Sequence, residues 1–261
     1  EKIAALFRYH LHALMLPSSP PTAGASWPMN EPPIHARPPA TVEQLEDQLS
    51  RPPAEVIEAV ARCDSDIVLL GVGGKMGPTM ARMARRAMDE AGLKRRVIGV
   101  SRFSDTGAME KLNSWGVQTV RCDLVDREQV ASLPDAGYVI HLAGFKFGAS
   151  QSPEQLWAIN CQAPLLVSQR YQHSQIVAFS TGSLYGLVEA SSGGSREDDE
   201  PRPDGEYSMA ALCRENIFRY YSRTLNIPMV VLRLNYATEL RYGVLVDIAQ
   251  QLLAANPVDI S

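Results

Sequence analysis

The sequence contains few cysteines, and none of them stands in a metal-binding or disulfide pattern. Its four cysteines are scattered over 261 residues, and no two of them form a C-x-x-C pair. Zinc sites and disulfide frameworks need such spacings, so we predict neither a metal site nor disulfide bonds. Free thiols persist in reducing compartments, and we therefore expect a cytoplasmic setting.

An excess of positive charge is also missing. Lys plus Arg number 25 and Asp plus Glu number 29, which gives a formal net charge of −4. Binding to a phosphate backbone relies on a basic field, so this balance argues against a nucleic-acid partner. The chain has no uninterrupted apolar run of about 18 residues, so it predicts no membrane-spanning helix and no membrane partner.

What remains is typical of a globular chain, with 45% apolar and 21% charged residues. Proline, however, is unevenly placed, since ten of the 18 prolines lie between Pro17 and Pro53. Such a composition is typical of a linker or loop. We therefore interpret residues 1–65 as an N-terminal extension and linker with short helices. We expect residues 1–16 to form one such helix, and we leave open that the natural start is Met29.

Two further short helices are predicted before residue 65. In T-V-E-Q-L-E-D-Q-L, Thr41 is a candidate N-cap and is followed by an acidic or amide side chain near the capping-box position. In P-A-E-V-I-E-A-V-A-R-C, proline stands at the helix start, where its missing N–H costs nothing.

From Asp66 onward, short apolar runs alternate with helical patterns. Strands are expected at 67–72, 96–101, 118–121, 138–143, 175–180 and 229–234, and helices at 76–91, 153–170 and 207–224. This alternation predicts βαβ units and an α/β fold of the Rossmann type, a doubly wound parallel sheet with helices on both faces. We assign it to residues 66–240. Its ligand should bind at the carboxyl ends of the strands.

A glycine-rich loop, G-V-G-G-K-M-G, joins the first strand to the first helix. Gly71, Gly74 and Gly77 give the spacing G-x-x-G-x-x-G, with Lys75 and Met76 between them. Glycine permits a tight turn and lets backbone N–H groups approach a pyrophosphate at the helix N-terminus. We predict a dinucleotide-binding loop, against the alternative of a turn that binds nothing.

The second strand ends at Ser101 and Arg102. A site that prefers NAD usually has Asp or Glu here to bind the ribose 2′-hydroxyl, whereas an arginine accommodates a 2′-phosphate. Lys75 adds further positive charge. These residues favour NADP, with NAD left open, unless Arg102 is simply a solvated surface residue.

Several motifs in order resemble the extended short-chain dehydrogenase/reductases, specifically the NAD(P)-dependent epimerase/dehydratase family. The resemblance covers residues 66–255. Its positions are Gly71, Gly74 and Gly77 in the loop, Asp123 and Leu124 after the third strand, His141, Ala143 and Gly144 after the fourth, Asn160 in the next helix, Thr181 to Gly186 after the fifth, and Tyr207.

This resemblance implies both a cofactor site and a reaction. Asp123 stands at the position of the adenine-contacting Asp of the family, beside Leu124, and Ala143 and Gly144 follow in the H-x-A-G motif. The segment H-L-A-G-F-K-F-G-A-S is similar to UDP-galactose 4-epimerases, which have a lysine near the cofactor. That lysine would be Lys146, or else a solvated loop residue.

The resemblance also implies the catalytic pair. Thr181 stands where the family has its catalytic Ser or Thr, and Tyr207 stands at the Tyr of Y-x-x-x-K. The implied activity is reversible hydride transfer at a hydroxyl or carbonyl carbon of a small molecule, with a sugar nucleotide as the candidate substrate. Dehydratases of the family carry Asp-Glu after the Thr. Here these positions are Gly182 and Ser183, which disfavours dehydration.

The largest departure from the family lies four residues after Tyr207, where the lysine is replaced by Ala211. A phenol ordinarily titrates near pH 10, and the lysine of the family favours its ionised form. Three interpretations stay open: Lys146 supplies the charge, Tyr207 acts only as an acid in a slow reductase, or the chain binds cofactor without turnover. The last makes it a dinucleotide-binding sensor or scaffold.

The remaining candidates have plainer interpretations. Cys161 and Cys213 are expected to be small core residues, and His141 to be a packing residue rather than a base. Family members pair through two helices, here 153–170 and 207–224, so we expect a homodimer. Residues 241–261 are expected to begin a substrate-binding region that is cut short, with the natural protein continuing past Ser261.

Overall fold

The computed structural model describes residues 38–145, 152–235 and 240–258. Its centre is one parallel sheet with the strand order β3-β2-β1-β4-β5-β6. The strands are β1 (Ile67–Leu70), β2 (Val97–Ser101), β3 (Gln118–Arg121), β4 (Tyr138–His141), β5 (Gln175–Thr181) and β6 (Met229–Leu234). This order is that of a doubly wound sheet, so the predicted Rossmann-type fold is confirmed.

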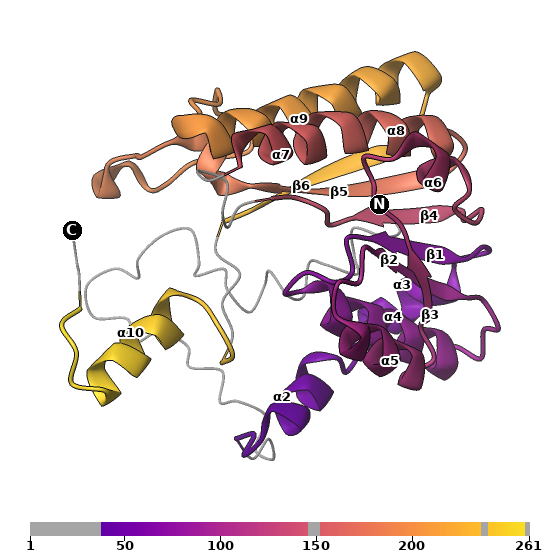
Figure 1. The fold of residues 1–261 in the computed structure, drawn as a ribbon, viewed down its shortest axis with the longest axis horizontal. Helices are drawn as coiled ribbons and strands as arrows, with labels where there is room; N and C mark the ends of the chain where they lie inside the picture. The colour runs from indigo at the N-terminus through magenta and orange to yellow at the C-terminus, as the bar shows by residue number, and fades with distance from the viewer. Residues whose placement is uncertain (1–37, 146–151, 236–239, 259–261) are drawn as a thin grey trace.

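Helices cover both faces of the sheet (Figure 1). They are α2 (Val42–Leu49), α3 (Ala54–Ala61), α4 (Gly77–Glu90), α5 (Thr106–Ser114), α6 (Arg127–Ala131), α7 (Pro153–Trp157), α8 (Ala163–Arg170), α9 (Gly205–Leu225) and α10 (Val244–Leu253). A π-helical segment, η1 (Ala158–Gln162), joins α7 to α8, and the short 3-10 turns η2 (Gly182–Tyr185) and η3 (Ala190–Ser192) follow β5.

The two faces of β1 explain why its sequence is continuously apolar. Ile67 and Leu69 pack in one core with residues of α3 and α4, whereas Val68 and Leu70 pack in the other with residues of α8 and α9. All four side chains are fully buried. A parallel strand between two helical layers has no solvent face and so needs no polar alternation.

The helices differ from expectation in two short additions and in one break. The short helices α5 and α6 were not predicted. Each begins at an aspartate N-cap, because Asp105 accepts from the N–H of Gly107 and Asp126 from the N–H groups of Glu128 and Gln129.

The expected helix over 153–170 is instead broken by η1. Pro164, in the first turn of α8, has no N–H to donate to the preceding turn, which is a recognised cause of such a break. The side-chain amide of Asn160, within η1, donates to the carbonyl of Leu156 at 2.8 Å. Asn160 is thereby held fully buried between α7 and α8.

The N-terminal helices pack against the Rossmann core. Thr41 caps α2 as predicted, accepting from the N–H of Gln44 at 3.2 Å. Asp47 of α2 accepts hydrogen bonds from Arg86 of α4 and from Arg51, and these bonds lower its pKa to about 2. The expected helix over residues 1–16 lies outside the described residues, and the boundary at residue 65 stays a prediction.

The C-terminal part of the chain contrasts with the core. Helix α10 contains no buried residue, and Leu245, Leu252 and Leu253 are exposed. Arg241, just before it, reaches Glu46 of α2 at 3.1 Å and Thr79 of α4 at 3.3 Å. Among the described helices, none is long and apolar enough to cross a membrane.

His141, at the end of β4, is fully buried and packs edge-on against Phe218, with ring centroids 5.0 Å apart. Burial, with a smaller contribution from the charge of Arg214, lowers the pKa of His141 to about 3. The imidazole is therefore neutral in the folded protein at neutral pH, which fits the predicted packing role.

We predict that His141 makes the protein acid-sensitive. An unfolded histidine takes up a proton near pH 6.5, whereas the folded one does so only near pH 3. Stability should therefore be complete above pH 6.5 and fall by up to about 1.4 kcal/mol per pH unit below it. Urea unfolding between pH 7 and pH 4 should show a shallower loss in His141→Leu than in the wild type. His173→Leu, at an exposed position, is the control and should keep the wild-type slope. Equal slopes in His141→Leu and the wild type would contradict this assignment.

Candidate functional site

A cleft of about 600 Å³ opens at the carboxyl ends of β1, β2, β3 and β4. This is the edge at which the strand order reverses between β1 and β4. The predicted residues that line it are Gly71, Gly74, Ser101, Arg102, Asp123, Leu124, Ala143 and Gly144. Four separate loops thus bring eight predicted cofactor-binding residues to one cleft. Sequence reasoning missed Phe103 and, from α7 and η1, Gln155, Ala158 and Ile159, which also line it.

Two glycines of the loop after β1 are required by the fold itself. Gly71 has a φ of +87°, and a Cβ there would lie 2.7 Å from the backbone of Ala143. A Cβ on Gly77 would lie 2.1 Å from the carbonyl oxygen of Val72. No side chain fits at either position, because real Cβ atoms do not approach backbone so closely.

Gly74 is different, because the fold does not demand a glycine there. It lies outside the left-handed region, and a Cβ would meet only the carbonyl oxygen of Gly71, at an ordinary 3.5 Å. Its backbone lines the cleft. A glycine that the protein does not need for itself fits a position where a ligand approaches the backbone.

Helix α4 begins immediately after this loop. No hydrogen bond from the Met76 side chain caps its first turn, and uncapped N–H groups at a helix start can accept an anion as a ligand. Met76 is partly buried against the core, and Gly77 begins the helix. Lys75 lies 4.8 Å from the ring of Tyr242, so its cation faces the segment before α10. These three residues support the loop rather than line the cleft.

Ser101 ends β2 next to the glycine loop, and Arg102 follows it. The Ser101 hydroxyl lies so close to Gly73 that a Cβ there would be 2.6 Å from it. Arg102 is exposed on the rim. Asp123 is fixed by a turn of its own, in which its carboxylate accepts from the N–H of Val125 at 3.2 Å.

The predicted catalytic residues lie apart from this lining. Thr181, at the end of β5, is 8% exposed, and its hydroxyl accepts from the N–H of Ser183 at 3.2 Å. Tyr207 is half-buried in the first turn of α9, and Ala211 follows it fully buried. Lys146 lies outside the described residues.

A residue that sequence reasoning missed connects α9 to the cleft. Arg214 is only 5% exposed, and its guanidinium donates to the side-chain oxygen of Asn160 at 2.6 Å and to the carbonyl of Ala143 at 3.4 Å. A Cβ on Gly144 would lie 2.8 Å from the same guanidinium. The sequence did hold a signal for this residue. The helical spacing places Arg214 on the core-facing stripe of α9, together with Tyr207, Ala211 and Phe218.

The two cysteines expected in the core are not fully buried. Cys161 of η1 and Cys213 of α9 are both partly exposed, and their sulfur atoms lie 3.2 Å apart. Burial, reinforced by the hydrogen bond with Cys213, raises the pKa of Cys161. The expectation that both are core residues is therefore wrong, because both side chains are partly exposed. The pair is a contact between two helices at the edge of the surface.

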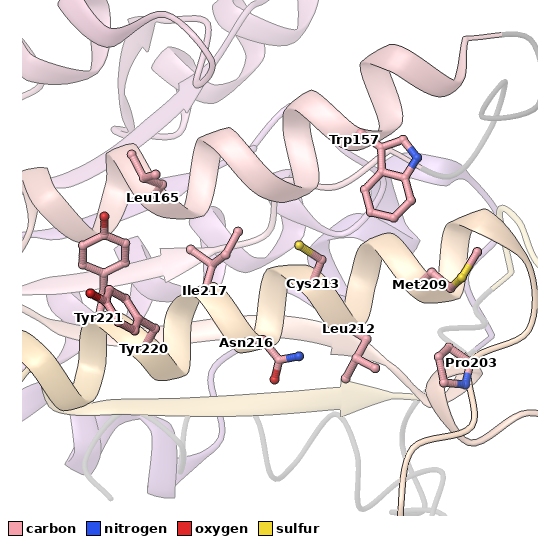
Figure 2. A pocket seen from close by; sticks show the side chains of 10 residues that line it. All are labelled: Trp157, Leu165, Pro203, Met209, Leu212, Cys213, Asn216, Ile217, Tyr220 and Tyr221. Carbon is pink, nitrogen blue, oxygen red and sulfur yellow. The ribbon is translucent and has the colours of Figure 1, made fainter.

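An apolar groove of about 590 Å³ lies on the outer side of these helices (Figure 2). It runs between α7–α8 and α9, with Trp157 and Leu165 on one side and Met209, Ile217 and Tyr220 on the other. Tyr220 is 62% exposed and Met209 43%. The helices that line this groove are those expected to pair in a homodimer.

Comparison with known proteins gives a family and a set of similar folds. A model described as the NAD dependent epimerase/dehydratase family matches residues 67–237. No curated protein matches the chain.

Among solved structures, UDP-glucuronic acid 4-epimerase from Bacillus cereus in complex with NAD has a TM-score of 0.57 at 22% identity, covering 74% of this chain and 65% of that one. UDP-glucose 4-epimerase from Thermotoga maritima with UDP-glucose has a TM-score of 0.59 at 21% identity, with coverages of 74% and 64%. The Bordetella bronchiseptica enzyme WbmG in complex with NAD and UDP has a TM-score of 0.60 at 19% identity, with coverages of 74% and 61%. At these identities the likeness shows the fold, and the chain spans less than two thirds of the length of these enzymes.

Proposed function

The chain belongs to the NAD-dependent epimerase/dehydratase family, and from this premise we propose that it is an NAD(P)-dependent oxidoreductase or epimerase. The observation that carries the proposal is the cleft at the switch point, where four loops converge on eight predicted cofactor-binding residues. Gly74 and the uncapped start of α4 fit the pyrophosphate of a dinucleotide, because one lets it approach and the other offers N–H groups.

For the cofactor, we propose NADP, with NAD as the alternative. Ser101 ends β2 and Arg102 follows it, exposed on the rim of the cleft. A guanidinium on the rim supports a 2′-phosphate better than a 2′-hydroxyl. Similar structures bind NAD, which supports the alternative.

For the substrate, we propose a sugar nucleotide. Enzymes of similar fold include 4-epimerases of UDP-glucuronic acid and UDP-glucose. Thr181 would donate a hydrogen bond to the substrate oxygen, and Tyr207 would exchange a proton with that oxygen. When bound, the nicotinamide supplies the hydride chemistry. Gly182 and Ser183 offer no carboxyl group for the elimination of water, which supports oxidoreduction or epimerisation over dehydration.

A second candidate function is dinucleotide binding without turnover. It is favoured by Ala211, which is fully buried and has no charge to offer the phenol of Tyr207. A chain of this kind would sense the cofactor or hold a partner.

For assembly, we propose a homodimer in which a second copy covers the groove between α7–α8 and α9. Exposed aromatic and sulfur-containing side chains gather there, including Tyr220 and Met209. Burying such side chains against a symmetric copy is favourable, and a two-fold pair is the commonest closed assembly.

We predict that the protein binds NADPH more tightly than NADH. Titration followed by nucleotide fluorescence should show that Arg102→Glu reverses this preference, because it replaces a cation with a carboxylate that repels the phosphate. Gly74→Ala should weaken both nucleotides about tenfold or more and leave the melting temperature unchanged. Arg62→Glu, an exposed change at the end of α3, is the control for net charge. Equal affinity of the wild type and Gly74→Ala would count against the loop as the binding element.

We predict turnover of a UDP-sugar that depends on Tyr207. With saturating nucleotide and UDP-glucose, UDP-galactose or UDP-glucuronic acid, Tyr207→Phe should lower kcat by about 100-fold or more, as expected for loss of a general acid–base group. Tyr220→Phe, on the exposed side of the same helix, should keep full activity. Tight nucleotide binding without turnover in the wild type would favour the second candidate function, and absence of nucleotide binding would exclude both.

We predict a dimer in solution that Tyr220→Glu dissociates. A carboxylate in the apolar groove would have to be desolvated at the interface, whereas it is free in water in the monomer. Light scattering should give half the wild-type mass for this variant. Arg223→Glu, also exposed on α9, should leave the mass unchanged. A wild type that is monomeric throughout would refute the assembly.

A further inference from the structure

Arg214 is a buried cation that the packing of α9 does not explain. Its guanidinium has an amide and a carbonyl as its hydrogen-bond acceptors, those of Asn160 and Ala143. Its Nε has no hydrogen-bond partner among the described residues. Burying a charge costs several kcal/mol unless a group of opposite charge compensates. Within the described part of the chain, no carboxylate forms a salt bridge with it.

The nearest carboxylate serves another arginine. Glu215 is 1% exposed and is bound in a bidentate pair by Arg233 of β6, at 3.0 and 2.9 Å, and by Arg219 at 3.1 Å. Glu215 makes no salt bridge with Arg214 among the described residues, and its charge acts on the arginine only through space, as the smallest of the influences on the pKa of Arg214. On the side of the sheet Arg214 faces His141, which is neutral.

The helix geometry directs Arg214 toward the first turn of α9. Side chains on a helix lean toward its N-terminus and cover the preceding turn. The preceding turn on this stripe holds Ala211, whose methyl group leaves room for a long side chain. Tyr207 lies one turn further toward the N-terminus. Burial lowers the pKa of Arg214, and the charge interaction with Tyr207 partly offsets this by raising it.

The guanidinium also adjoins the cleft. Gly144, which lines the cleft, has no Cβ, and a Cβ there would be 2.8 Å from the guanidinium. The carbonyl of Ala143, another lining residue, accepts from it. The guanidinium of Arg214 therefore lies against the wall of the cleft.

We propose that Arg214 supplies the cation of the active site and stabilises the phenolate of Tyr207. It would take the place of the lysine of the family, whose position is occupied by Ala211 in this chain. The inference rests on the proposed function. In the oxidative direction, the substrate O–H bond would break and its proton would pass to the phenolate oxygen of Tyr207, while a bound oxidised nicotinamide would supply the acceptor for the carbon-bound hydrogen as hydride. The reverse step returns both. Arg214 keeps its protons throughout and acts as a positioning residue, through its charge on Tyr207.

The first test measures the phenol directly and needs no substrate. The ultraviolet absorbance of tyrosinate is followed against pH, and the Tyr207→Phe titration is subtracted to isolate Tyr207. Arg214→Met and Arg214→Gln should move the ionisation of Tyr207 upward by about one pH unit, a tenfold change. Arg214→Lys should keep the wild-type titration. Arg219→Met, which removes a cation from the same helix, is the matched control and should also keep it.

The second test is rescue. Adding Ala211→Lys to Arg214→Met returns a cation to the stripe one turn earlier, and should restore both the titration and the pH profile of kcat with the UDP-sugars. If Arg214 had only a structural role, adding Ala211→Lys would restore neither the titration nor the pH profile. If Arg214→Met does not fold, Arg214→Gln, which keeps a donor for Asn160, takes its place in both tests.

The outcomes separate this inference from the proposed function. A titration that Arg214→Gln leaves unchanged overturns the inference, even where the wild type turns over a UDP-sugar. A titration that shifts as expected supports the inference, even where no UDP-sugar reacts and the proposed function fails.

Discussion

The candidate site depends on the position of β1 between β2 and β4. Leu70 pairs with Val100 on one side and with His141 on the other, so the three strands end level at one edge of the sheet. The loops that follow are pressed together, since the backbones of Gly71 and Ala143 leave no room for a methyl group. Beyond this contact the chain diverges in opposite directions across the sheet, and the cleft is the space that this divergence leaves open.

Much of this arrangement was predictable because it is encoded locally. The strands are apolar runs, and the loop after β1 is recognisable from its glycines, which are needed where backbone segments approach closely. Helices α5 and α6 escaped prediction because they are short and polar, and their aspartate caps, Asp105 and Asp126, resemble ordinary turn residues. The break at η1 escaped because a continuous helical pattern hides the effect of Pro164 on the turn before it.

The site was predictable up to the point where it depends on contacts distant in sequence. The cofactor residues follow strand ends, so the topology alone brings them together. Arg214 meets Ala143 across 71 residues and Asn160 across 54, and nothing in either segment indicates the other. The cysteines next to two of these residues show the same limit, because Cys161 and Cys213 meet only when η1 and α9 pack side by side.

The substitution at Ala211 and the burial of Arg214 are best understood together. A lysine at 211 would place a second cation on the same stripe, one turn from the guanidinium, and two buried like charges at this spacing repel each other. The two residues are therefore alternatives for one charge rather than additions to each other. An alanine at 211 also gives the longer arginine side chain the space to reach past it. The absence of the lysine is thus compatible with a charged site, because the fold buries a different cation, Arg214, against the wall of the cleft.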